Sequence, residues 1–172
     1  MDERLAALAD RAEIEEVVRR YGRGIDRRDF GLVRSCYHPD ATDDHGSFAG
    51  TVDEYLVWVE RLTAKYSMTM HLIAGVVIDL AGDVAAAEST GVAIHRSDDP
   101  APHLNLATGF RYLDRFERRD GRWAIAARQA LGEWAVEIPA DRWWPIPDDH
   151  PTGRPDRLDP LYALLGGLPD AP

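Results

Sequence analysis

The stretch "RYGRGIDRRDFGLVRSCYHPDA", residues 20–41, decides the fold. It completes an amphipathic helix predicted over residues 3–28, in which apolar side chains recur at helical spacing: Ile14, Val17, Val18, Tyr21 and Ile25. A second, short helix is predicted over residues 28–37 and ends before Pro39. Asp26 stands where the apolar face of the first helix should continue. It is therefore either a solvated charge or a carboxylate held inside a pocket.

The rest of the chain places this helical start in the α+β class. A third helix is predicted from Thr51, where Thr51 and Glu54 have the spacing of a capping box. Four long strands rich in β-forming residues follow, at 66–80, 84–96, 104–119 and 122–138, and Asp120-Gly121 predicts a tight hairpin. A short strand near residues 41–43 is expected to join them. Helices followed by consecutive strands indicate helices packed on a mostly antiparallel sheet.

Size and charge limit the classes of function. A chain of 172 residues suits one domain with a sizeable core. The net charge of −10, without a basic run, argues against nucleic-acid binding and against anionic membrane surfaces. No apolar run approaches the roughly 20 residues that span a bilayer, and the acidic, helical N-terminus is unlike a secretory signal, so a cytoplasmic protein is expected. Cys36 is alone, which excludes a disulfide framework and favours a buried, inert thiol.

The last segment has a different composition. Residues 139–172 contain eight of the eleven prolines and little periodicity, which prevents long regular elements. Trp143 and Trp144 would nevertheless be costly to leave in water. We therefore expect one domain over residues 1–138 and a Pro/Trp-rich tail that packs on it or on a partner subunit.

The order of these patterns resembles the SnoaL-like branch of the nuclear transport factor 2-like superfamily over roughly residues 3–137. The resemblance rests on "EIEEVVRRYGRGIDRRDFGLVRSCYHPDA", on "MHLI" at residues 70–73, and on the hairpin "YLDRFERRDGRWAIAAR". It implies a cone-shaped α+β barrel, in which three N-terminal helices pack against a strongly curved sheet around an apolar pocket. It also implies a homodimer or homotrimer.

The resemblance also implies a site. In dehydrochlorinases and bile-acid dehydratases of this family, an Asp at the end of the first helix pairs with a His on the first long strand. Asp26 and His71 match these positions, Tyr21 matches a functional Tyr five residues before the Asp, and Arg128 matches an Arg on the final strand. An acidic residue on the second long strand has only Glu88 as a weak counterpart.

Each of these residues also has a structural interpretation. Asp26 lies beside two arginines and is typical of a solvated helix end, and His71 is typical of a satisfied core histidine. Tyr21 fits simple packing, and Arg128 fits a structural ion pair. In the catalytic interpretation, His71 is the general base, Asp26 fixes its tautomer, and Tyr21 and Arg128 polarise the substrate.

A second polar cluster lies in "HPDATDDHG", residues 38–46. Its ligand types suit a metal, but a turn and a helix cap explain them more simply, so no metal is predicted. Asp44 and His45 are kept as polar contacts at the pocket. Further candidates for the pocket lining are aromatic or soft apolar residues, which are otherwise ordinary core: Tyr55, Trp58, Met70, Phe110 and Trp134.

These observations predict a cofactor-independent lyase or isomerase that acts on a hydrophobic small molecule such as a polyketide, terpenoid, steroid or aromatic compound. Elimination, isomerisation and cyclisation all begin with proton removal beside a carbonyl, so the residues leave the reaction open. Two alternatives are a non-catalytic ligand-binding or association module and the small subunit of an aromatic-ring dioxygenase. Neither nucleic acid nor membrane is expected as a partner.

Overall fold

A computed structural model describes residues 3–98 and 105–168. Three helices come first: α1 (Glu3–Asp26), α2 (Phe30–Ser35) and α3 (Val52–Thr63). Between them lie two strands, β1 (Tyr37–Asp44) and β2 (Ala49–Thr51). The long strands β3 (Met68–Ala81), β4 (Val84–Arg96), β5 (Leu106–Arg119) and β6 (Arg122–Glu137) follow. The tail contains a 3-10 turn, η2 (Ala140–Arg142), and one short helix, α4 (Pro160–Gly166).

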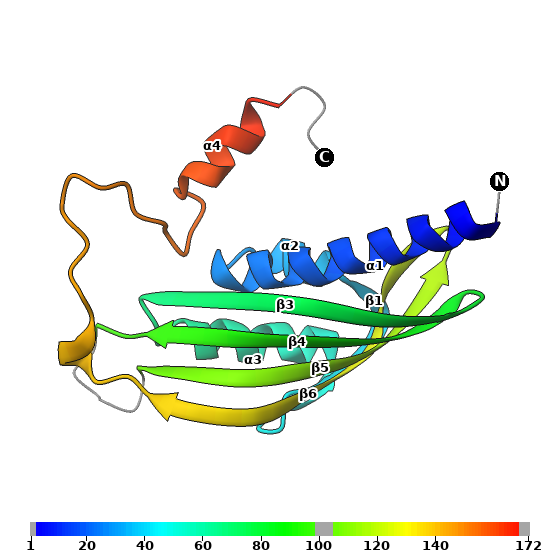
Figure 1. The fold of residues 1–172 in the computed structure, drawn as a ribbon, viewed down its shortest axis with the longest axis horizontal. Helices are drawn as coiled ribbons and strands as arrows, with labels where there is room; N and C mark the ends of the chain where they lie inside the picture. The colour runs from blue at the N-terminus through cyan, green and yellow to red at the C-terminus, as the bar shows by residue number, and fades with distance from the viewer. Residues whose placement is uncertain (1–2, 99–104, 169–172) are drawn as a thin grey trace.

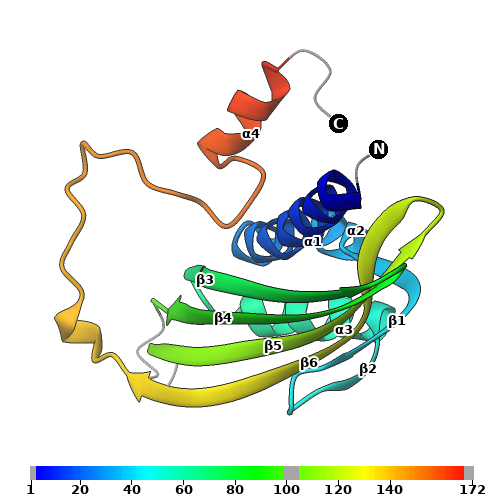
Figure 2. The same cartoon turned by 45° about the vertical axis from the view of Figure 1, so that its right-hand side comes forward.

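All six strands form one sheet in the order β2-β1-β6-β5-β4-β3. Every neighbouring pair is antiparallel except β1 with β6, which is parallel. The α+β class and the curved, mostly antiparallel sheet are therefore confirmed. The predicted barrel is open, because β2 and β3 are free edges, and the sheet wraps around α3 as a cone-like half shell (Figure 2).

Local chemistry explains where the helices begin. The side chain of Asp29 accepts a hydrogen bond from the amide of Leu32 and starts α2, two residues later than predicted. The predicted capping box of Thr51 and Glu54 is present at the start of α3. Pro39 does not end α2, which stops at Ser35; instead it lies within β1, a longer strand than the short one expected near residues 41–43.

The core lies between α1, α3 and the concave face of the sheet. The predicted apolar face of α1 is buried at Ile14, Val18, Tyr21 and Ile25. Cys36 is buried as expected, and burial raises the pKa of its thiol to about 11, which keeps it protonated. Within the described ranges, no helix is long and apolar enough to cross a membrane.

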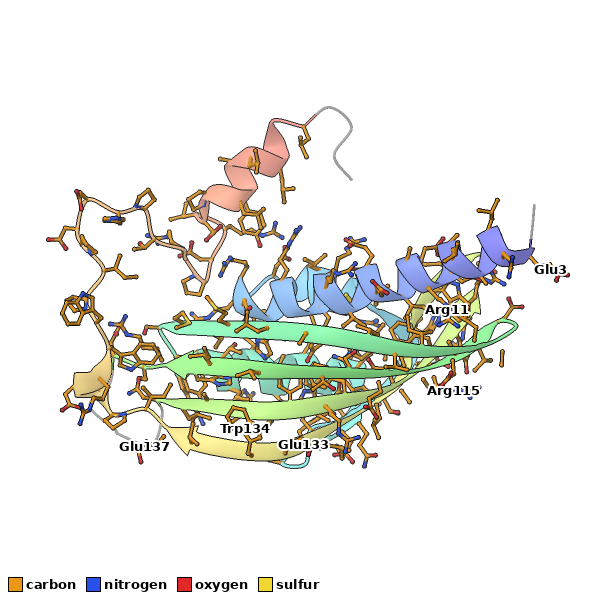
Figure 3. All side chains as sticks on the ribbon, in the orientation of Figure 1. Glu3, Arg11, Arg115, Glu133, Trp134 and Glu137 are labelled. Carbon is orange, nitrogen blue, oxygen red and sulfur yellow. The ribbon has the colours of Figure 1, made fainter. Side chains whose placement is uncertain are left out.

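The opposite, convex face of the sheet carries exposed apolar side chains, among them Leu72, Val77, Trp134 and Val136. Figure 3 looks onto this face and labels Trp134 beside Glu133 on β6. Self-association through an apolar surface stays a prediction.

Candidate active site

A cavity of about 330 Å³ opens between the end of α1, α3 and the concave face of β3 to β6. Aromatic and aliphatic side chains make up most of its wall, and its polar groups include three histidines: His45, His71 and His95. An apolar cavity with a few convergent polar groups is the usual form of a small-molecule site.

Asp26 and His71 meet at the edge of this cavity. The Nδ1–H of His71 donates to Oδ1 of Asp26 at 2.7 Å, and the backbone N–H of His71 donates to Oδ2 at 2.8 Å. The hydroxyl of Thr69 adds a third hydrogen bond, to Oδ1, at 3.1 Å. Both side chains are largely buried, with 13% of Asp26 and 10% of His71 exposed. Because the carboxylate accepts from Nδ1, the neutral ring leaves Nε2 unprotonated.

The period of β3 brings this pair together. Thr69, His71 and Ile73 alternate onto the concave face, toward α1. The helix lies close to β3 at Gly22, where a Cβ would make ordinary contacts at 3.4 Å from Ile73 and 3.8 Å from His71. Asp26 is the last residue of α1, one turn beyond this contact, and so its side chain reaches the strand.

His95 is a third histidine of the cavity, which the sequence analysis did not single out. Its ring lies 6.0 Å from that of His71 and 4.7 Å from that of Tyr66. Burial, reinforced by the charge that His71 can carry, lowers the pKa of His95 to about 4. Its Nδ1 has no hydrogen-bond partner. His95 is therefore a neutral imidazole at neutral pH, able to hydrogen-bond a ligand.

A second Asp–His pair lies in the loop cluster that the sequence analysis kept in reserve. Nδ1 of His45 is hydrogen-bonded to Oδ1 of Asp43, and the hydroxyl of Tyr37 donates to Oδ2 of Asp43 at 2.6 Å. The ring of His45 stacks on Tyr55 with centroids 4.9 Å apart, and its Nε2 lies 3.5 Å from the hydroxyl of Tyr21. His45 thus lines the cavity as predicted.

Tyr21 belongs to a buried group of phenols. Its hydroxyl is hydrogen-bonded to that of Tyr55 at 2.5 Å. Burial raises the pKa of both phenols well above the ordinary value, so both stay protonated and keep a proton to donate. Tyr21 also lines the cavity, where its predicted polarising role has a donor available.

Arg128 lies beneath these phenols. Its Nε and one terminal nitrogen donate to the two carboxylate oxygens of Asp114, each at 2.7 Å, and the pair is buried. The guanidinium stacks 4.0 Å from the centroid of Tyr21 and 4.1 Å from that of Tyr112. Arg128 does not line the cavity, so the structure favours the ion-pair interpretation of this residue, with Tyr21 between it and any ligand.

The other predicted lining residues divide into those inside the cavity and those on the outer face of the sheet. Tyr55, Trp58 and Phe110 line the cavity. The placement of Met70 and Trp134 was wrong: both lie on the convex face, with 45% and 48% of their surface exposed. Met70 is on the outward-facing alternation of β3. Trp134 follows a register shift in β6, where Gly132 pairs with Phe110 but Trp134 pairs with Gly109, and this irregularity turns its side chain outward.

Asp44 also lies outside the cavity. Its carboxylate accepts a hydrogen bond from the amide of Gly46 at 2.8 Å and so stabilises the turn after β1. The weak candidate Glu88 is on the convex face, paired with Arg111. Among residues 3–98 and 105–168, no three His, Cys, Asp or Glu side chains gather as a metal would require.

Comparisons with known proteins identify the family and the fold. The family model described as a SnoaL-like domain matches residues 6–129 of this chain. No curated protein sequence matches the chain at a significant level.

Solved structures resemble the fold at low sequence identity. A hexachlorocyclohexane dehydrochlorinase (LinA type 2) has a TM-score of 0.73 at 19% identity, over 82% of this chain and 97% of that one. A candidate scytalone dehydratase from Novosphingobium aromaticivorans has 0.70 at 20%, over 80% and 97%. A protein from Kribbella flavida has 0.69 at 21%, over 76% and 95%.

Proposed function

The chain belongs to the SnoaL-like family and has its nuclear transport factor 2-like fold, and from that premise we propose that it is a cofactor-independent lyase-type enzyme. It removes a proton from a hydrophobic small molecule and eliminates or rearranges a neighbouring group. The observation that carries the proposal is the buried Asp26–His71 pair at the edge of an otherwise mostly apolar cavity.

His71 is the general base. Asp26 holds Nδ1–H, so Nε2 is the atom that accepts the substrate proton, and the carboxylate stabilises the imidazolium that forms. The two further hydrogen bonds from Thr69 and from the backbone of His71 fix the carboxylate, so the ring keeps one tautomer and one orientation. In a mostly apolar cavity, this charge pair interacts more strongly than it would in bulk solvent.

Neutral donors of the cavity polarise the substrate. Removal of a proton beside a carbonyl places negative charge on the carbonyl oxygen, which needs a hydrogen-bond donor. The Tyr21 phenol and the neutral imidazole of His95 are two such donors in the wall. The mostly aromatic wall and a volume of about 330 Å³ favour a compact hydrophobic substrate, such as an aromatic compound, a small terpenoid or a short polyketide.

Two substitutions on β3 test the proposal. Hydroxylated polyketides, terpenoids and aromatic ketones are screened for elimination or isomerisation by the native chain. His71→Ala is expected to lower turnover by a factor of about 100 to 10,000, the usual contribution of a general base. Leu72→Ala, the next residue on the strand, is the matched control, because Leu72 is on the convex face and outside the cavity. Native-like turnover in a folded His71→Ala variant would refute the assignment and favour a ligand-binding module.

A further inference from the structure

A second Asp–His pair faces the same cavity as the first. Proton removal by His71 does not require this second pair. Asp43 is buried, and both of its oxygens are engaged, by His45 and by Tyr37. As in the Asp26–His71 pair, the carboxylate holds Nδ1 and leaves Nε2 available to the cavity. When one small cavity holds two imidazoles that are each oriented by a carboxylate, one can act as the general base and the other as the general acid.

The two imidazoles are held at separate places in the wall. The ring of His71 lies 6.0 Å from Phe110, Phe110 lies 4.5 Å from Tyr112, and Tyr112 lies 5.8 Å from His45. His71 and His45 are thus connected along the wall through two rings, those of Phe110 and Tyr112. A compact ligand lying on these rings would have one imidazole at each of its two ends.

We propose that Asp43 and His45 form the acid that protonates a departing hydroxyl group, so that the reaction is the dehydration of a β-hydroxy carbonyl compound. This inference rests on the proposed function, because it needs His71 as the base. It adds the identity of the leaving group, which the Asp26–His71 pair alone leaves open.

The leaving group decides whether such an acid is needed. Chloride departs as a stable anion and takes no proton, so a single base is enough to eliminate it. Hydroxide is a poor leaving group and must be protonated as its bond to carbon breaks. A second oriented imidazole is therefore useful for loss of water and superfluous for loss of chloride.

The proton transfers of this reaction balance within the cavity. Nε2 of His71 takes the proton from the α-carbon, the electrons of that C–H bond form the carbon–carbon double bond, and the bond from the β-carbon to oxygen breaks. The imidazolium of His45 gives its Nε2 proton to the departing oxygen, and water leaves. His71 then holds one proton more and His45 one fewer, and exchange with solvent restores both. Tyr21, 3.5 Å from Nε2 of His45, is a neighbour through which this proton can pass.

Two reactions on the same carbon skeleton distinguish the role of the base from the role of the acid. Benzylacetone in deuterium oxide reports α-proton exchange by NMR, which needs only the base. Its β-hydroxy derivative reports dehydration through the absorbance of benzylideneacetone, which needs the base and the acid. The native chain is expected to catalyse both reactions.

The same substitution at each pair gives matched variants. His71→Gln is expected to lose both reactions. His45→Gln is expected to lower dehydration by about 100-fold or more and exchange far less. If His45→Gln does not fold, as judged by circular dichroism, Asp43→Asn takes its place with the same expectation.

The outcomes are distinct. No exchange by the native chain contradicts the proposed function itself. Exchange without dehydration by the native chain, dehydration by His45→Gln at the native rate, or an equal loss of both reactions in the folded variants overturns the second acid while leaving the base in place.

Discussion

At the scale of the residue, His95 shows how burial sets the state of a side chain. It ends the concave face of β4, beside His71 and Tyr66, and its Nδ1 finds no partner. An imidazolium there would be poorly solvated and would repel a protonated His71. The fold therefore keeps this ring neutral, and a neutral ring is what a hydrogen bond to a carbonyl compound needs.

This neutrality has a consequence for stability. The pKa of His95 falls from 6.5 to about 4 on folding, so between these values the unfolded chain binds more protons than the folded one. Stability attributable to His95 is present above about pH 6.5 and is lost as the pH falls toward 4. His95→Gln should flatten this fall by up to about 3 kcal/mol.

Urea unfolding of both proteins across this pH range measures the difference. His150→Gln is the matched control, because His150 is exposed in the tail and should leave the pH profile of the native chain unchanged. Parallel profiles for the native chain and His95→Gln would show that His95 is not held neutral by the fold.

At the scale of the element, two glycines near the end of α1 differ in what they permit. A Cβ on Gly24 would lie 2.7 Å from Cγ2 of Val33 and 3.1 Å from its backbone nitrogen, so α2 packs directly on this position. A Cβ on Gly22 meets only ordinary contacts, the nearest at 3.4 Å from Ile73. Both are helical, so Ala would be favoured by about 1 kcal/mol at either position if nothing opposed it.

We therefore expect opposite effects from the same substitution. Gly22→Ala should be neutral or stabilising by up to about 1 kcal/mol. Gly24→Ala should be destabilising by about 1 to 3 kcal/mol, since the backbone of α2 must move. Thermal unfolding of the two variants checks this. A gain of stability in Gly24→Ala would mean that α1 and α2 are not in the close contact described.

The elements that were predictable are those with local causes. The capping box of α3, the apolar face of α1 and the limits of β4 follow from neighbouring residues. The length of β1 did not follow, because its pairing with β6, more than 80 residues away in sequence, is what extends it to Tyr37. Strand faces were also poorly predicted, because Met70 and Trp134 have side chains suited to a cavity but point outward. β-strand alternation turns Met70 outward, and a register shift between β5 and β6, which the sequence does not reveal, turns Trp134 outward.

The candidate site, like the fold, was predictable only in part. The resemblance indicated Asp26 and His71, which the structure brings within hydrogen-bond distance. His95 could have been found from its two-residue spacing to Ala93 on a buried alternation. The pairing of Asp43 with His45 follows from two-residue spacing along β1 and the loop after it, which was interpreted as a turn and a metal-like cluster instead.

At the scale of the whole molecule, the tail returns to the domain and two of its side chains bind the carboxylate of Asp29. Figure 1 shows the chain leaving β6, crossing beyond the ends of the long strands, and coming back above the end of α1 at α4. There Arg157 donates to Oδ1 of Asp29 at 2.8 Å, and the hydroxyl of Tyr162 donates to Oδ2 at 3.1 Å. Asp29 is also the N-cap of α2, so one carboxylate serves both a helix and the tail.

Separating these two roles tests how the tail is held. Arg157→Ala with Tyr162→Phe removes both contacts of the tail with Asp29 and leaves the cap of α2 intact, so it should speed amide hydrogen exchange in residues 154–166 with little change in the melting temperature. Asp29→Ala should release the tail to the same extent and also cost about 1 kcal/mol of stability, because the amide of Leu32 loses its cap. Hydrogen exchange by mass spectrometry and thermal melting distinguish the two variants. If exchange in the tail stays slow in the double variant, the nearby pair of Arg27 with Asp159 carries the attachment, and Asp29 matters to α2 alone.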